Sequence, residues 1–121
     1  MTELVIQTYF DARHGWVTVW LDVQGRQTLR MVLDTGTFLS AISEGTRTDL
    51  TSEGLLEPLP RDRWLLRGLA LDSQPIADLP VQVSRRATEA GVDGMLGLDF
   101  LGRYTEVRFH FPTMRLTLVT P

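Results

Sequence analysis

The 121-residue sequence contains no cysteine, so disulfides, thiol nucleophiles and zinc–thiolate sites are excluded. It also lacks an excess of basic residues. The net charge is −3, whereas a surface that binds the phosphate backbone of a nucleic acid needs many more basic residues. The two histidines, His14 and His110, have no metal-ligand spacing with other potential ligands. We therefore expect no nucleic-acid partner, no metal and no other cofactor.

Long apolar runs are missing as well. No uninterrupted run approaches the roughly 18 residues of a membrane-spanning helix. The start, Met1-Thr2-Glu3, leads into an alternating pattern and not into a basic region followed by an apolar stretch. We therefore expect no signal peptide, no membrane partner and a cytoplasmic location. Hydrophobic residues make up 43% and charged residues 22%, which is ordinary globular usage, and the length suits one domain over 1–121.

Short runs that alternate with a period of two make up most of the chain, which predicts strands. They cover 3–10, 16–23, 27–33, 38–42, 63–71, 76–84, 104–111 and 115–119. We interpret 43–60 as mostly loop with room for one short helix, and 85–93 as a polar connection in which Arg85 and Arg86 are solvated charges. These patterns predict a mostly-β domain, a closed or half-closed barrel.

An acidic residue lies where one apolar strand ends. Met31-Val32-Leu33 leads directly to Asp34, Gly36 permits a sharp turn, and a second apolar strand leaves over 38–42. A carboxylate held between two core strands has the rigid support that a positioned acid or base needs. An ordinary Asx-type turn between strands would use the same residue types. The motif alone leaves both interpretations open.

A second apolar element, Met95-Leu96-Gly97, is followed by Leu98-Asp99-Phe100-Leu101. Together with Leu33-Asp34-Thr35-Gly36-Thr37 it resembles the retropepsin-like aspartic proteases, and the ending FHFPTMRLTL is similar to the closing hairpin of bacterial members. The resemblance implies an acid-protease closed β-barrel in which 95–97 packs against the strand that carries Asp34 and precedes one short helix. We interpret Asp99 as a cap of that helix.

The resemblance also implies roles for the residues of the first motif. Asp34 would be catalytic, Thr35 would hydrogen-bond across a two-fold axis, and Gly36 would present its backbone N–H near the carboxylates. Thr37, in the small or polar position that follows, would support the active-site loop. The second motif, Met95-Leu96-Gly97, would support the site without taking part in the chemistry.

The implied activity is that of an aspartic endopeptidase acting on a peptide or protein substrate. In this mechanism one ionised carboxylate draws a proton from water while a second, protonated one polarises the scissile carbonyl. The sequence contains one Asp-Thr-Gly and no Asp-Ser-Gly. The second carboxylate must therefore come from an identical chain across a two-fold axis. We predict a homodimer with Asp34 of each chain as the catalytic pair.

Members of the family cover their substrate with a hairpin flap, and the candidate here is 58–69. Its tip would lie near 61–63, Arg63 and Trp64 would contact substrate, and Trp64 could equally be core. This flap has one glycine as an obvious flexible point, which leaves open a weak or inactive dimeric peptide-binding or assembly module. A third alternative is a monomeric barrel for small apolar ligands. The terminal strands 3–10 and 115–119 are expected to be open edges that interleave with a partner.

Overall fold

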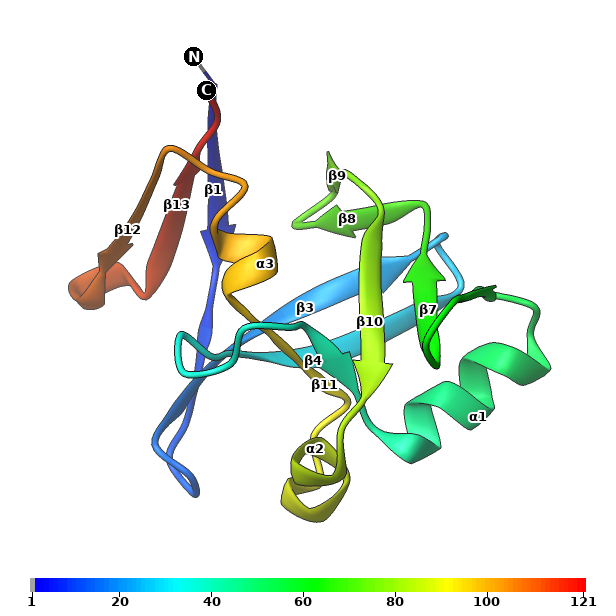
Figure 1. Ribbon diagram of the computed structural model, residues 1–121. Coiled ribbons are helices and arrows are strands. Elements are labelled where there is room, and N and C mark those ends of the chain that lie inside the picture. Colours follow the sequence, from blue (N-terminus) through cyan, green and yellow to red (C-terminus); the bar gives the residue numbers. More distant parts are fainter. Residues whose placement is uncertain (1) are drawn as a thin grey trace.

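The computed structural model describes residues 2–121, which fold mostly as β-strands (Figure 1). The strands are β1 (Glu3–Gln7), β2 (Tyr9–Asp11), β3 (Trp16–Val23), β4 (Gln27–Leu33), β5 (Ala41–Ile42), β6 (Leu56–Leu59), β7 (Arg63–Leu66), β8 (Leu69–Leu71), β9 (Gln74–Ile76), β10 (Leu79–Val83), β11 (Gly94–Leu96), β12 (Glu106–His110) and β13 (Arg115–Val119). The helices are α1 (Glu44–Ser52), α2 (Arg85–Ala90), α3 (Leu98–Leu101) and the 3-10 turn η1 (Phe111–Thr113). No helix among these residues is long and apolar enough to cross a membrane.

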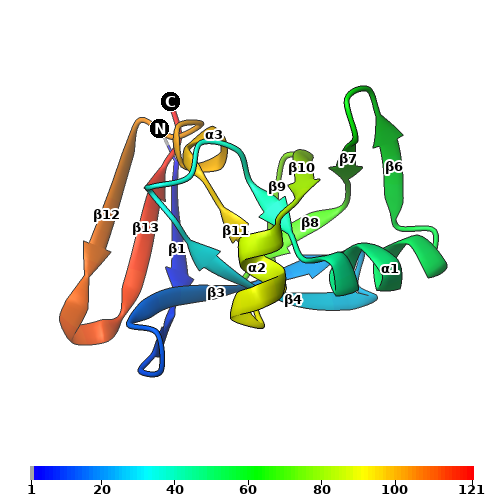
Figure 2. The same ribbon diagram turned by 60° about the horizontal axis from the view of Figure 1, so that its bottom comes forward.

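The strands form two sheets. The larger has the order β6-β7-β10-β5-β11-β4-β3-β8-β9, with β2 also paired to β3, and it curls into a half-barrel (Figure 2). The smaller has the order β1-β13-β12 and lies on the left in Figure 1. The prediction of a mostly-β, barrel-like domain with a short helix after Met95-Leu96-Gly97 is confirmed.

The core lies inside the curl of the larger sheet. Alternation along β3 places Val19, Leu21 and Val23 inside, each with no exposed surface. Leu21 lies opposite Leu29 of β4 and Leu71 of β8, so one row of side chains connects three strands. Burying such apolar rows supplies the main driving force for folding.

The arrangement that positions the candidate site is the insertion of β11 between β4 and β5. β11 pairs parallel with β4, where Leu96 lies opposite Leu33, and antiparallel with β5. The close approach at its first residue requires glycine, because a Cβ on Gly94 would lie 2.3 Å from the Ala41 carbonyl oxygen. The end of β4, and with it the start of the following loop, is therefore fixed from inside the sheet.

Two helices lie in segments that were predicted to be mainly loop. α1 covers nine residues of the 43–60 segment, and α2 covers most of the connection at 85–93. Each begins at a serine cap: the Ser43 hydroxyl oxygen accepts from the Thr46 N–H, and the Ser84 hydroxyl oxygen accepts from the Ala87 N–H. Both segments contain few apolar residues, so no helical periodicity is visible in the sequence. The serine caps and the tertiary contacts make these segments helical.

The terminal strands pair with each other inside one chain. Leu4 of β1 lies opposite Leu118 of β13, and Val107 of β12 lies opposite the same residue from the other side. β13 is therefore the central strand of the smaller sheet. The expectation that 115–119 forms an open edge is wrong, because both of its edges are already hydrogen-bonded.

Candidate active site

Asp34 follows β4 directly and lies at the carboxyl end of this inner strand of the larger sheet. Its backbone N–H donates to the carbonyl oxygen of Leu96 at 3.0 Å, which extends the β4–β11 pairing by one residue. The Asp34 side chain is 17% exposed. The strand pair thus delivers a carboxylate that is largely shielded by protein but still reaches solvent.

The loop that follows holds this carboxylate with its own residues. The Gly36 N–H donates to Asp34 Oδ1 at 2.9 Å, and the Thr37 hydroxyl donates to Asp34 Oδ2 at 2.8 Å. Hydrogen bonds to an ionised acceptor are among the stronger ones in proteins. Locally this is the Asx-type turn that the sequence suggested, and the turn fixes the orientation of the carboxylate.

Thr35 points away from this hydrogen-bonded network. It is exposed, and within residues 2–121 its hydroxyl has no hydrogen-bond partner. It lies on the rim of an apolar groove that also includes Leu33, Leu101 and Phe109. The three residues after Asp34 thus differ in role: the Gly36 N–H and the Thr37 hydroxyl bond to the Asp34 carboxylate, while the Thr35 hydroxyl remains available.

The 34–40 loop is braced by α3. The Leu98 N–H donates to the Thr37 carbonyl at 2.8 Å, and the Asp99 N–H donates to the Phe38 carbonyl at 2.9 Å. Gly97 permits this contact, because a Cβ there would lie 2.6 Å from the Thr37 oxygen and 2.9 Å from the Phe38 oxygen. The glycine of the second motif is thus required by close backbone packing against the first.

Asp99 strengthens the same junction and does not cap the short helix as expected. The helix cap is Gly97, which makes no side-chain cap bond. The Asp99 carboxylate accepts from the Ser40 N–H at 3.0 Å and from the Ser40 hydroxyl at 2.6 Å. The Ser40 oxygen in turn accepts from the Gly97 N–H at 3.0 Å. Asp99 therefore ties the end of the loop to α3.

A cavity of about 80 Å³ opens beside Asp34. Its walls are mainly apolar and include Trp16, Val32, Val92 and Met95. Trp16 stacks on His14 at 4.2 Å between ring centroids. The His14 ring bonds to the Asp11 carboxylate, and this bond lowers the pKa of the Asp11 carboxyl. The cavity has the size of one aliphatic side chain and lies next to the carboxylate.

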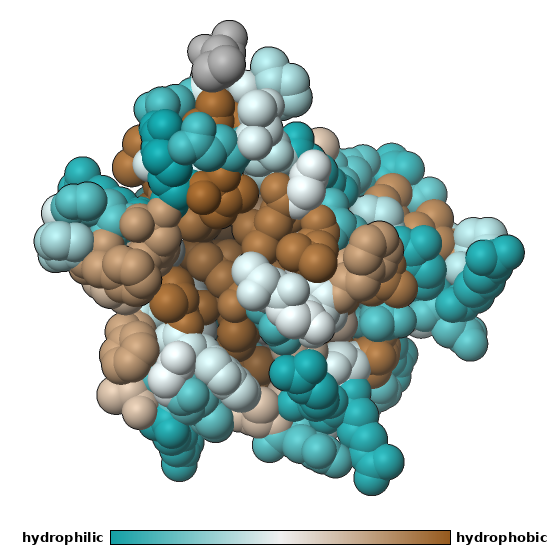
Figure 3. Space-filling model, turned by 60° about the vertical axis from the view of Figure 1, so that its left-hand side comes forward, coloured by the Kyte–Doolittle hydropathy of each residue, from teal (hydrophilic) through white to brown (hydrophobic). Residues whose placement is uncertain are grey.

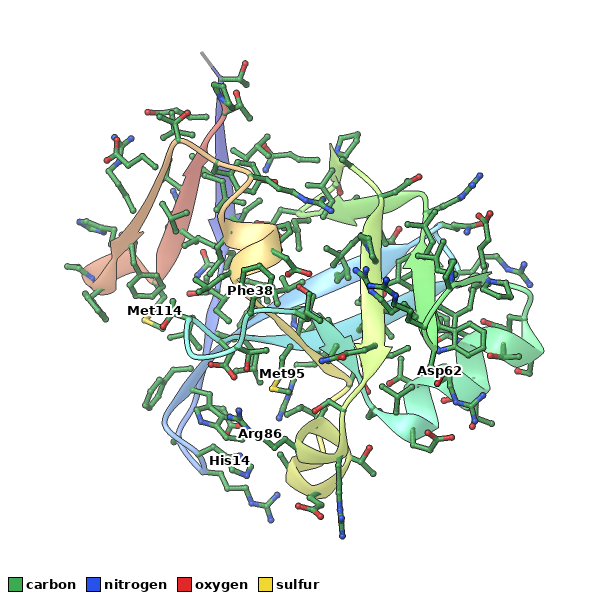
Figure 4. All side chains as sticks on the ribbon, in the orientation of Figure 1. His14, Phe38, Asp62, Arg86, Met95 and Met114 are labelled. Carbon is green, nitrogen blue, oxygen red and sulfur yellow. The ribbon has the colours of Figure 1, made fainter. Side chains whose placement is uncertain are left out.

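Arg86 was interpreted as a solvated charge, yet it reaches the site. It projects from the first turn of α2 toward Met95 (Figure 4), lines the cavity, and its Nη2 lies 3.4 Å from Asp34 Oδ2. Its side chain remains 69% exposed. Arg86 and Asp34 are 52 positions apart in the sequence. The pairing of β10 with β5 and the packing of Ala87 against Val32 and Met95 bring α2 to the site, and short-range sequence patterns do not reveal these contacts.

The hairpin proposed as a flap, β6–β7, lies apart from the 34–40 loop in both ribbon views (Figures 1 and 2). β7 pairs with β10, where Trp64 lies opposite Val81, and Trp64 packs against the main core. Neither Arg63 nor Trp64 lines the cavity beside Asp34. Within residues 2–121, no group of three or more potential ligands is arranged to hold a metal ion.

A solved structure has a similar architecture along nearly the whole chain. A retropepsin-like aspartic protease from Rickettsia conorii matches with a TM-score of 0.60 and 18% identity, over 97% of this chain and 89% of that one. The chain has a retropepsin-like fold. The sequence matches no family model and no curated protein. The retropepsin-like fold places Asp34 and Gly97 in one braced junction, and it leaves the chemistry to be argued from these residues.

Proposed function

We propose that this chain is a bacterial-type retropepsin-like aspartic endopeptidase that works as a homodimer. The observation that carries the proposal is the half-buried Asp34 carboxylate, held by Gly36 and Thr37 on a loop braced by α3 and open to a side-chain-sized cavity. A precisely held acid next to an apolar pocket suits a reaction on a peptide whose side chain is anchored nearby. The proposed substrate class is a peptide or protein.

The reaction requires two carboxylates in one site. With Asp34 contributed by each chain, one ionised carboxylate accepts a proton from a water molecule, and the water oxygen attacks the scissile carbonyl carbon. The other carboxyl, protonated because two adjacent like charges are unfavourable, donates a hydrogen bond to the carbonyl oxygen. The carboxyl that took the proton from water then gives it to the peptide nitrogen, the C–N bond breaks, and the products leave as a carboxylic acid and an amine. The bonds from Gly36 and Thr37 keep each carboxylate oriented, and an exposed Thr35 is free to bond across the two-fold axis.

The proposal is tested by replacing the carboxylate with its amide. Asp34→Asn should reduce cleavage of a peptide library by on the order of 10³ or more between acid and neutral pH, because the amide cannot take up the proton of water. Asp49→Asn, at an exposed position of α1, is the matched control and should retain wild-type cleavage. Cleavage that survives Asp34→Asn, or a wild-type dimer that cleaves no peptide, would contradict the proposal.

A second candidate is a dimeric peptide-binding or assembly module with little turnover. It is favoured by the contact of Arg86 with Asp34 and by the distance of the β6–β7 hairpin from the loop. Under this alternative, peptides bind equally well to wild type and Asp34→Asn in titration calorimetry. No cleavage sensitive to a statine-type inhibitor would then accompany the binding.

The cytoplasmic location remains a proposal from the sequence and is tested by fractionation of cells.

A further inference from the structure

Two concave surfaces meet at the end of β4, where Leu33 lines both, and they differ in charge. The larger is a groove of about 230 Å³ without a charged residue in its wall. Figure 3 shows this side of the molecule, where apolar side chains gather in a hollow between polar margins. The smaller is the cavity beside Asp34, and within residues 2–121 Arg86 is the single basic residue that lines it. The wall next to the candidate catalytic residue therefore combines apolar side chains with one cation.

Arg86 has few partners of its own. Its neighbour Arg85 bonds to Glu89, one helical turn further on, with 3.0 Å between Nε and Oε1. The residue one turn after Arg86 is Ala90, which has no acceptor in its side chain. Among residues 2–121, the guanidinium of Arg86 makes one hydrogen bond, from Nη2 to Asp34 Oδ2. A strong charge-assisted bond measures about 2.7–2.9 Å, so this contact of 3.4 Å is weak.

The guanidinium is therefore available to a ligand. It has five N–H donors and can bind one carboxylate through two parallel hydrogen bonds. Its side chain is 69% exposed, so an incoming group reaches it from solvent. Trp16 and Met95 offer apolar surface in the same cavity. A side chain that suits both features has a short apolar stem that ends in a carboxylate.

We propose that Arg86 makes the site selective for a substrate with an acidic side chain, glutamate in particular, at the position that enters the cavity beside Asp34. The inference rests on the proposed function, because it names the substrate class of the same site. The substrate carboxylate competes with Asp34 for the guanidinium and draws it away from Oδ2. An acidic substrate thus removes a cation from the carboxylate that must accept the proton of water. Selectivity and release of the catalytic group come from one residue.

The selectivity is tested with pairs of peptides. Glutamate is placed at one position at a time around the cleaved bond, and glutamine, which has nearly the same shape and no charge, replaces it in the partner peptide. The peptides contain no other acidic residue and have amidated C-termini, so the tested side chain carries the only carboxylate. We expect one position at which kcat/KM is about fivefold higher for glutamate at low ionic strength, the size expected for an exposed ion pair.

A third peptide, with glutamine and a free C-terminus, tests the other source of a carboxylate. A preference for the free C-terminus without one for glutamate would overturn the inference.

Variants of Arg86 test whether this residue is the cause. Arg86→Gln should bring the ratio of glutamate to glutamine cleavage to about one, because the ion pair is lost. The glutamate peptide should then be cleaved more slowly and the glutamine peptide faster. Arg86→Lys should keep a smaller preference for glutamate, since it retains the charge without the planar fork. Arg85→Gln, whose partner is Glu89, is the matched control and should leave the ratio unchanged.

The outcomes separate the inference from the proposed function. Cleavage without a preference for glutamate at any position, or a preference that persists in Arg86→Gln, would overturn the inference and leave the proposed function intact. If no peptide is cleaved, binding of the labelled peptides is measured by fluorescence anisotropy. Tighter binding of the glutamate peptide by wild type but not by Arg86→Gln would support recognition by Arg86 and contradict the proposed function. Equal binding of both peptides would then overturn both.

Discussion

The 34–40 loop and the β6–β7 hairpin are both turns between strands, but they are attached differently. The loop donates a hydrogen bond from the Asp34 N–H to the Leu96 carbonyl of β11, and its carbonyls accept hydrogen bonds from the N–H groups of Leu98 and Asp99 in α3. The hairpin is joined to the sheet along β7 and to α1, and its turn residues Arg61 and Asp62 have left-handed φ values of 65° and 54°. The carboxylate is therefore fixed firmly, whereas its proposed cover is attached elsewhere in the larger sheet.

Gly97→Ala should have the largest effect on the loop. The added Cβ would lie within 3 Å of two backbone oxygens, so the loop or α3 must move. We expect a loss of about 3 kcal/mol in the free energy of unfolding and loss of cleavage, measured by urea denaturation and peptide hydrolysis. Gly45→Ala in α1, where nothing lies within 4 Å, is the control and should stabilise by up to about 1 kcal/mol. Equal stability of the two variants would refute the close-packing argument.

Asp99→Ala comes next, because it leaves the Ser40 N–H and hydroxyl without their partner. The expected cost is about 2 kcal/mol, together with slower cleavage as the loop end loosens. A double-mutant cycle with Ser40→Ala measures the coupling directly. If the two changes act through one contact, their effects should be less than additive by at least about 0.5 kcal/mol. Strict additivity would mean that Asp99 acts elsewhere.

The sequence was most informative where neighbouring residues determine the structure. The apolar strand ending at Asp34 and the Met95-Leu96-Gly97 element were both predicted, since alternation and glycine spacing are short-range properties. The contact of Asp99 with Ser40 joins residues 59 positions apart, and no local pattern reports it. The same holds for Arg86. Its helix α2 was not predicted, because the helix is marked by the Ser84 cap and has no apolar stripe.

The open edge was mis-assigned for a related reason. Strand propensity shows that 3–10 and 115–119 favour strands, but it does not show which strand lies between which. The hairpin of β12 and β13 places β13 inside the smaller sheet and leaves β12 outside. Topology, and not composition, therefore decides which strand of the smaller sheet is an outer strand.

Arg86→Gln should change the electrostatics at Asp34 without changing the stability of the fold. Since the Arg86 side chain is exposed and screened by solvent, the free energy of unfolding should change by less than about 0.5 kcal/mol. Binding or cleavage of a neutral peptide should rise several-fold, because Asp34 Oδ2 loses a competing cation. Arg85→Gln, which alters only the exposed pair with Glu89, is the matched control. High salt should reduce the difference in peptide binding or cleavage between wild type and Arg86→Gln. A difference that salt does not alter would contradict the interpretation that Arg86 acts through its charge.

The smallest effect on cleavage is expected at the hairpin turn, with Arg61→Asn combined with Asp62→Gly. Both positions have left-handed backbone, which the Asn-Gly pair adopts more easily than arginine and aspartate. We expect stabilisation of about 0.5–1 kcal/mol in urea denaturation. Cleavage of a short peptide should stay at the wild-type rate because the β6–β7 hairpin lies apart from the 34–40 loop (Figures 1 and 2). A loss of cleavage comparable with that of Gly97→Ala would show that the hairpin is coupled to Asp34 after all, and the contrast between a fixed carboxylate and a separate cover would fail.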